Sequence, residues 1–297
     1  MLVVFLFGIL VGGAAVALLL SWQARTSYNE AAYQLPDVPD RVEPVAEGPD
    51  GTDASDDTEE TRISTRMPVL ALVLDDCGSS IELARRLHEH KLPLTWSIIP
   101  NLRYSREIAD MLRGSGTPFL VHVPMQAEVD PDGKAGTRGA DYLIGVGMKP
   151  EAIRRTLLTL LDTLPGAYGI SNHRGSKATA DRRTMEAVVR VLQERNLFFL
   201  DSRTSSRSIA YDTAKAFGLR TASNSGFLDN EPNLQKMEVE LNLAIAHAKE
   251  EGGAIAICHL RPDTVAFLER LSRDELAQKG VLLVTLPQLM QLREGGR

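Results

Sequence analysis

Residues 69–78 read VLALVLDDCG, an apolar run that stops at two adjacent aspartates, a cysteine and a glycine. Six consecutive apolar residues are typical of a strand that is buried on both faces, as in a parallel sheet covered by helices. In barrels built from such strands, reactive side chains lie at the carboxyl ends of the strands. The stretch therefore predicts a central strand that delivers Asp75 and Asp76 to a functional edge.

The same alternation continues to the end of the chain. Helical spacing of apolar residues separates most of the strand-like runs, for example in SIELARRLHEH and EAIRRTLLTLLDTL. We therefore predict one α/β domain with seven or eight strand–helix units, which favours a distorted (β/α)7–8 barrel. An open doubly wound sheet is the alternative, but its dinucleotide-binding form is disfavoured because no Gly-x-Gly-x-x-Gly follows the first strand. The predicted strands are 69–74, 94–99, 118–123, 167–171, 197–200, 219–223, 254–258 and 281–285.

The chain divides into three parts by composition. Residues 1–24 contain no charged side chain, and an apolar segment of about twenty residues is long enough to cross a bilayer as a helix. We expect a membrane anchor there, with a cleavable signal peptide as the alternative. Residues 25–66 are rich in Pro, Gly, Asp, Glu, Ser and Thr, so we expect an acidic disordered linker. Residues 67–297 form the predicted barrel domain.

The composition bears on two questions, whether the protein binds nucleic acid and whether its cysteines can form a disulfide. The formal net charge is -6 and aromatic residues make up 5% of the chain, which argues against a nucleic-acid-binding protein. The chain has two cysteines, Cys77 and Cys258, which follow the predicted first strand and end a late one. Neighbouring strands would bring them close enough for a disulfide, and two buried thiols are the alternative.

Histidines and further polar residues also gather at predicted strand ends. His122, His173 and His259 each lie where an apolar run stops, whereas the other three histidines lie in helical patterns. Carboxylate and imidazole groups together suit a divalent cation, zinc above all. A second carboxylate beside the metal ligands can act as a general base, and a histidine can protonate a leaving group. Asp201 also ends a strand, where it serves the site or simply caps a turn.

The chain from about 67 to 292 resembles the divergent polysaccharide deacetylases of the bacterial envelope, a branch of the NodB-homology carbohydrate esterases. The matching segments occur in the order of that family and cover nearly the whole domain. They are LVLDDCG at 72–78, SIIPNLRYSREIA at 97–109, FLVHVPMQ at 119–126, GISNHRGSKAT at 169–179, FFLDSRTS at 198–205 and AICHLRPDT at 256–264.

The resemblance implies a distorted barrel of the NodB-homology type and metal-dependent removal of N-acetyl groups from a polysaccharide. By position, Asp75 matches the general base and Asp76 the metal-binding aspartate. His122 matches the first metal-binding histidine, and His259 matches the histidine that acts as general acid. Asp201 falls where a supporting aspartate is expected.

One position departs from the pattern of that family. The family has a second metal-binding histidine four residues after the first, and this chain has Gln126 there. Gln is a poor zinc ligand beside imidazole or carboxylate. Either His173 completes the site, or Gln126 binds weakly through its carbonyl oxygen, or the metal is lost. The neighbours Asn172 and Arg174 are supporting candidates, since the NHRGS stretch stands in place of an arginine-containing motif that orients the base.

These observations predict a zinc-dependent hydrolase that removes N-acetyl groups from a cell-envelope glycan such as peptidoglycan. The alternative is a deacetylase-fold protein that has lost its chemistry and binds an envelope glycan or a protein partner. In either case the apolar N-terminus predicts a chain anchored in the inner membrane with its domain in the periplasm, or exported after signal cleavage. The Gly- and Asp-rich segment 126–147 is predicted to be a lid over the site or a plain surface loop.

Overall fold

The computed structural model describes residues 67–129 and 142–295. The predicted anchor and linker, residues 1–24 and 25–66, lie outside the described residues, as does most of the predicted lid. Within the described ranges, no helix combines the length and the hydropathy needed to cross a membrane.

Parallel strands alternate with helices through the described chain, as the apolar pattern predicts. The strands are β1 (Val69–Cys77), β2 (Thr95–Ile98), β3 (Phe119–Met125), β4 (Gly169–Arg174), β5 (Phe198–Asp201), β6 (Thr221–Ser223), β7 (Gly226–Phe227), β8 (Gly253–His259) and β9 (Leu282–Val284).

Some of the helices begin at a side-chain cap. Ser80, Asp181 and Asn233 each accept a hydrogen bond from a backbone N–H in the first turn of the helix that follows. The helices are α2 (Ile81–Glu89), α3 (Ser105–Gly114), α4 (Pro150–Thr163), the 3-10 turn η2 (Ala178–Ala180), α5 (Arg182–Glu194), α6 (Ala210–Ala216), α7 (Leu234–Glu251), α8 (Pro262–Leu268), α9 (Arg273–Gln278) and α10 (Leu286–Gly295).

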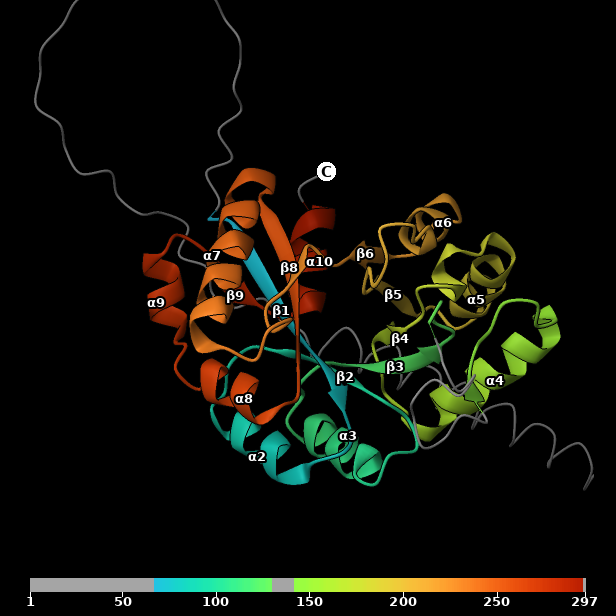
Figure 1. The fold of residues 1–297 in the computed structure, drawn as a ribbon, viewed down its shortest axis with the longest axis horizontal. Coiled ribbons are helices and arrows are strands. Elements are labelled where there is room, and N and C mark those ends of the chain that lie inside the picture. The colour runs from blue at the N-terminus through green and yellow to red at the C-terminus, as the bar shows by residue number, and fades with distance from the viewer. Residues whose placement is uncertain (1–66, 130–141, 296–297) are drawn as a thin grey trace, which may run out of the picture.

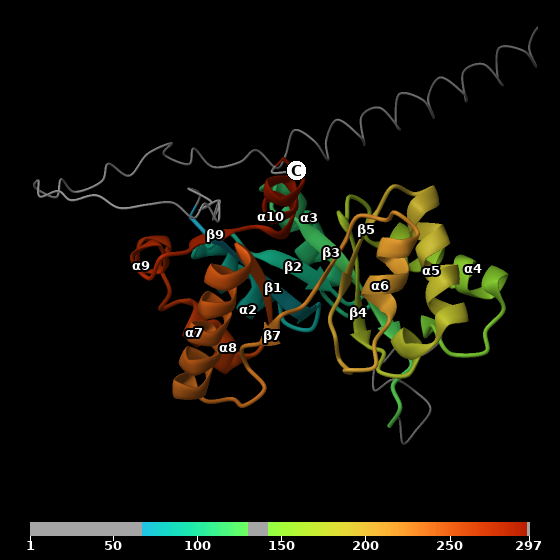
Figure 2. The ribbon, with the colours of Figure 1, turned by 90° about the horizontal axis from the view of Figure 1, so that it is seen from above.

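The sheet curves into an incomplete barrel. Its strands follow the order β6-β5-β4-β3-β2-β1-β8-β7, and β9 pairs with the first half of β1. The short segment between β6 and β7 bridges the two ends of the sheet, since Asn224 N–H donates to Asp201 in β5 and Ser225 N–H donates to Ile255 in β8. Figures 1 and 2 show α4, α5 and α6 grouped beyond β4 and β5, with α7, α8 and α9 at the other side near β1 and β8.

Side chains of the strands alternate between two cores. In β1, Leu70, Leu72 and Leu74 pack toward the surrounding helices, whereas Val69, Ala71 and Val73 pack into the barrel interior. Leu286 and Leu289 of α10 fill that interior. Because side chains in a strand alternate with a period of two, Asp75 follows Val73 in the inward-facing row. It therefore lies at the end of the apolar barrel interior.

The second aspartate reaches the same edge because the strand bends. Strict alternation would direct Asp76 away from Asp75, but Asp76 has a left-handed backbone with φ of 60°. The pairing of β1 with β2 also shifts register between Leu74 and Cys77. The bend therefore lies at Asp76 itself, and Gly78 with φ of 134° completes the turn.

Candidate active site

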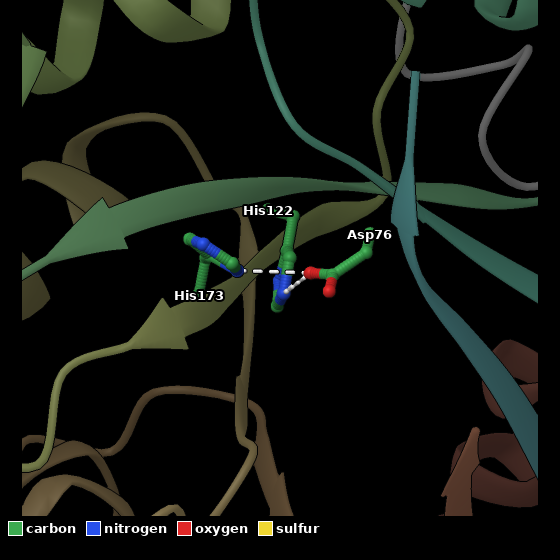
Figure 3. Close-up of side chains that lie close together, drawn as sticks. All are labelled: Asp76, His122 and His173. Carbon is green, nitrogen blue, oxygen red and sulfur yellow. Dashed lines mark ion pairs between the residues drawn. The ribbon is translucent and has the colours of Figure 1, made fainter. Parts of the chain in front are cut away.

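A carboxylate and two imidazoles converge at the carboxyl edge of the sheet. Asp76 comes from the end of β1, His122 from β3 and His173 from β4, and their rings and carboxylate point toward one another (Figure 3). Asp76 Oδ1 lies 2.9 Å from His173 Nδ1 and 3.3 Å from His122 Nε2. The two rings meet edge to face with centroids 5.0 Å apart. The three residues therefore form one compact polar cluster, and His173 is part of it.

The cluster has the donor set and spacing of a zinc site. Its three candidate ligand atoms all lie within 4.8 Å of one another. In a tetrahedral site with bonds of about 2.0–2.1 Å, neighbouring ligand atoms are roughly 3.3 Å apart, close to the two distances from Asp76. Three protein ligands leave a fourth position for water or substrate, which is the arrangement of hydrolytic rather than structural zinc sites.

The ionisation state of Asp76 also suits a cation. Burial alone would raise its pKa, but hydrogen bonds and charge interactions with His122 and His173 outweigh burial and hold the pKa of Asp76 well below its usual range. The carboxylate is therefore negative at neutral pH. A bound cation would replace the histidine contacts as the source of that stabilisation.

Asp75 lies beside the cluster with an acceptor to spare. Its side chain is buried, and its Oδ2 is 3.5 Å from His122 Nε2. Its Oδ1 is buried without a hydrogen-bond partner among the described residues. Burial raises the pKa of Asp75, and the neighbouring His122 opposes that rise. A buried carboxylate that is short of one partner is poised to accept a proton from a molecule entering the site.

A carboxylate–histidine pair lies at the end of the neighbouring strand β8, where Asp229 from the loop after β7 meets His259. His259 is the residue of β8 that pairs with Asp75 in register, and its Nδ1 lies 2.8 Å from Asp229 Oδ1. The other oxygen, Asp229 Oδ2, accepts hydrogen bonds from His259 N–H and from Thr264 Oγ1. Burial would lower the pKa of His259, but Asp229 outweighs it and raises that pKa above its usual value. His259 is thus set to carry a proton, and Phe227 stacks on its ring.

Gln126 makes contacts of another kind. Its Oε1 accepts a hydrogen bond from Val146 N–H at 2.9 Å. Its backbone N–H donates to Ile144, and its carbonyl accepts from Lys177 and Ala178. Gln126 therefore ties the 142–148 segment to the end of β3. Its side-chain oxygen Oε1, the atom that could bind a metal, already accepts a hydrogen bond. Of the alternatives that the sequence leaves open, the geometry favours His173 as the third ligand.

Two of the remaining supporting candidates, Asp201 and Asn172, hold loops through their hydrogen bonds. Asp201 accepts hydrogen bonds from Arg203 N–H, Ser208 Oγ and Tyr211 N–H, so it organises the loop before α6. Asn172 donates to the carbonyl of Arg174 and accepts from Ser202 N–H. Arg174 has a left-handed backbone with φ of 56°. Catalytic support from these residues stays a prediction.

Three residues that contact the site were not predicted from the sequence. Asp229 follows β7, a strand of only two residues. So short a strand has no apolar run from which it could be predicted. Ser97 and Ser171 lie inside strands, two residues from positions that face the interior. Counting by two from Thr95 and from His173 would have found both serines on the inner face.

The cysteines are two free, buried thiols, as one of the two alternatives predicts. Burial raises the pKa of Cys77 and Cys258 well above the usual value, so both stay protonated at neutral pH. They contribute packing rather than reactive sulfur.

Comparison with known proteins matches the domain as a whole. The sequence profile described as "divergent polysaccharide deacetylase" matches residues 72–290. An uncharacterised protein of Haemophilus influenzae is 32% identical over 209 residues, which cover 70% of this chain and 72% of that protein. The Escherichia coli protein YibQ, also uncharacterised, is 30% identical over 202 residues, 68% of this chain and 61% of YibQ.

The fold also recurs in a solved structure. The crystal structure of the uncharacterised protein ATU2773 from Agrobacterium tumefaciens superposes with a TM-score of 0.69 at 20% identity, covering 76% of this chain and 90% of that one. At that level of identity the likeness is one of fold alone. The predicted NodB-type barrel is confirmed.

Proposed function

The chain belongs to the divergent polysaccharide deacetylase family, and from that membership we propose that it is a metal-dependent hydrolase that removes N-acetyl groups from a cell-envelope glycan. One observation carries the proposal: Asp75, buried and with one oxygen unpartnered among the described residues, lies beside a cluster of three candidate zinc ligands. Structural ion pairs normally satisfy every buried oxygen. A buried carboxylate oxygen that can still accept a hydrogen bond beside the candidate metal ligands is the expected feature of a general base.

Asp76, His122 and His173 would hold the metal. When bound, a divalent cation lowers the pKa of a water ligand to about 7 and polarises a carbonyl group. Zinc is the proposed ion because two imidazoles and one carboxylate suit it. The family and the geometry support this choice, and a metal assay decides it.

The other residues move protons. Asp75 accepts the proton of the attacking water, and its buried position raises its basicity for that task. His259 donates a proton to the departing nitrogen. Asp229 raises the pKa of His259, which favours the protonated ring, and it fixes that ring with Nδ1 directed at the carboxylate and Nε2 left to face the substrate.

The test is acetate release by the full-length, zinc-loaded protein from N-acetylglucosamine oligomers and from peptidoglycan. Asp75→Asn keeps the size of the side chain but removes the base, so the rate is expected to fall by about 10²–10⁴-fold while zinc stays bound. If the wild-type protein binds zinc but releases no acetate from either substrate, the hydrolase proposal is wrong. A glycan- or partner-binding protein would then be the better description, although Gln126 no longer requires it because His173 supplies a third ligand.

We also propose that residues 1–24 anchor the protein in the inner membrane and place the domain in the periplasm. The support is the uncharged apolar run at the N-terminus. Fractionation of cells that express the full-length chain tests this: the protein should stay in the membrane fraction after a high-salt wash, and protease added to spheroplasts should digest its domain.

A further inference from the structure

Two serines form a hydrogen-bonded chain below His122. His122 Nδ1 lies 2.7 Å from Ser171 Oγ, and Ser171 Oγ lies 2.5 Å from Ser97 Oγ. The three residues come from β3, β4 and β2, and all are buried. They belong to the inward-facing rows of their strands. The chain of contacts therefore runs across the barrel interior just under the metal cluster.

We propose that Ser171 and Ser97 are positioning residues that hold the His122 ring with its proton on Nδ1 when Nε2 binds the metal. The proposal rests on the metal site of the proposed function. It concerns the direction in which the hydroxyl protons point, and so which nitrogen of His122 is free.

The direction follows from the chemistry of the imidazole ring. A neutral histidine has one N–H donor and one nitrogen acceptor. His122 Nε2 is the nitrogen beside Asp75 and Asp76, so a cation in the cluster needs Nε2 without a proton. Nδ1 then carries the proton and donates to Ser171, whose own proton is left to point at Ser97.

Ser97 takes the last position in this order. Its hydroxyl accepts from Ser171, so the order His122 to Ser171 to Ser97 gives each hydroxyl oxygen a donor in turn. The reverse order would need Nδ1 without a proton and therefore a proton on Nε2, which a cation in the cluster excludes.

The surroundings explain why hydroxyls at these positions need such a role. The inner face below them is apolar and includes Val73, Leu120 and Leu200. A hydroxyl buried there costs free energy unless it is hydrogen-bonded. Alanine would fill both serine positions without that cost if packing alone mattered.

Metal-binding histidines generally direct their second nitrogen at a fixed acceptor, and removing that acceptor typically lowers metal affinity by about 10–100-fold. Ser171→Ala in the full-length protein should therefore weaken zinc binding by roughly that factor, measured by competition with a chromogenic chelator. Ser97→Ala should weaken it less, because Ser171 remains to accept from Nδ1. Ser171→Thr restores a hydroxyl and should recover part of the loss.

The matched control is Ser105→Ala. Ser105 is also buried and hydrogen-bonded, to Ile99 and Leu102 at the start of α3. Its loss should lower thermal stability and leave the zinc affinity unchanged.

A second measurement needs no substrate. The chain has six histidines, so ¹⁵N labelling of histidine alone gives an assignable NMR spectrum. In the zinc-loaded wild-type protein the hydrogen bond to Ser171 should protect the Nδ1 proton of His122 from exchange with water, and Ser171→Ala should make that proton exchange faster.

An unchanged zinc affinity and an unchanged exchange rate of the His122 Nδ1 proton in Ser171→Ala would overturn the proposal, as would wild-type protein that binds no zinc. If Ser171→Ala fails to fold, the wild-type spectrum and Ser97→Ala decide. Failure of the hydrolase proposal looks different: zinc affinity responds to Ser171→Ala as expected, but no acetate is released.

Discussion

At the scale of single residues, the third candidate metal ligand comes from a different strand than the family resemblance implies. The family resemblance places a histidine at position 126, at the end of β3. In this chain that position is Gln126, which binds the 142–148 segment, and the imidazole comes from His173 on β4. The two strands are hydrogen-bonded neighbours, with Pro124 paired to His173. A ligand contributed by either strand therefore reaches the same cation position.

This exchange predicts a contrast between two alanine variants. His173→Ala should remove one of three ligands and abolish stoichiometric zinc binding, which inductively coupled plasma mass spectrometry of the purified protein measures. Gln126→Ala should keep zinc and cost about 1 kcal/mol of stability through the lost hydrogen bond to Val146. If Gln126→Ala lost zinc and His173→Ala kept it, the third ligand would be Gln126 on β3 and not His173 on β4.

Asp229→Asn should change the pH dependence of the proposed reaction. Asp229 raises the pKa of His259, and a general acid must be protonated to act. Below the pKa of the free ring His259 is protonated in both proteins, so activity there should be similar. As the pH rises, His259 should lose its proton at a lower pH in the variant than in the wild-type protein. The alkaline limb of kcat/KM should therefore move to lower pH. A profile that keeps the wild-type alkaline limb would remove His259 from the role of acid.

At the scale of elements, the site depends on close contact between neighbouring strands. Gly169 begins β4, and a Cβ there would lie 2.1 Å from the carbonyl oxygen of Phe198 in β5. No real side chain fits that space, so β4 and β5 would have to separate. His173 and Ser171 are carried on the same strand, and their positions follow from this contact.

Gly169→Ala should therefore destabilise the protein by about 1–3 kcal/mol, measured by urea unfolding. Gly114→Ala is the control, because a Cβ at the end of α3 meets nothing within 4 Å and alanine favours the helix. Equal stability of the two variants would mean that β5 moves away at little cost.

At the scale of the whole molecule, strands far apart in the sequence contribute to one candidate cation site. Asp76 lies on β1, and His122 and His173 lie on β3 and β4, so a metal bound to all three binds the folded chain and not the unfolded one. Ligands of this kind stabilise by mass action.

Zinc at 100 times its Kd should raise stability by about 2.7 kcal/mol, a rise in Tm of roughly 5–10 °C for a domain of this size. Calorimetry with and without a chelator measures the shift. His122→Ala should abolish it, and a shift that persists in that variant would place the ion elsewhere.

Much of this architecture follows from local sequence patterns. Burial repeats every two residues in a strand and every three to four in a helix, so eight of the strands and several of the helices between them could be located without coordinates. Asp75, His122 and His259 could be assigned to one edge because parallel strands end on the same side. The two-residue strand β7 and Asp229 after it could not, since so short a strand leaves no apolar period.

Local spacing in the chain thus accounts for the strands, for the edge on which they end and for the polar residues at that edge, because each follows from neighbours within a few positions. The partnerships across the barrel were open until the chain was folded: His173 rather than Gln126 beside Asp76, Asp229 with His259, and the serines beneath His122. They depend on strand register and on the left-handed turn at Asp76, and both arise from packing between segments that are distant along the chain.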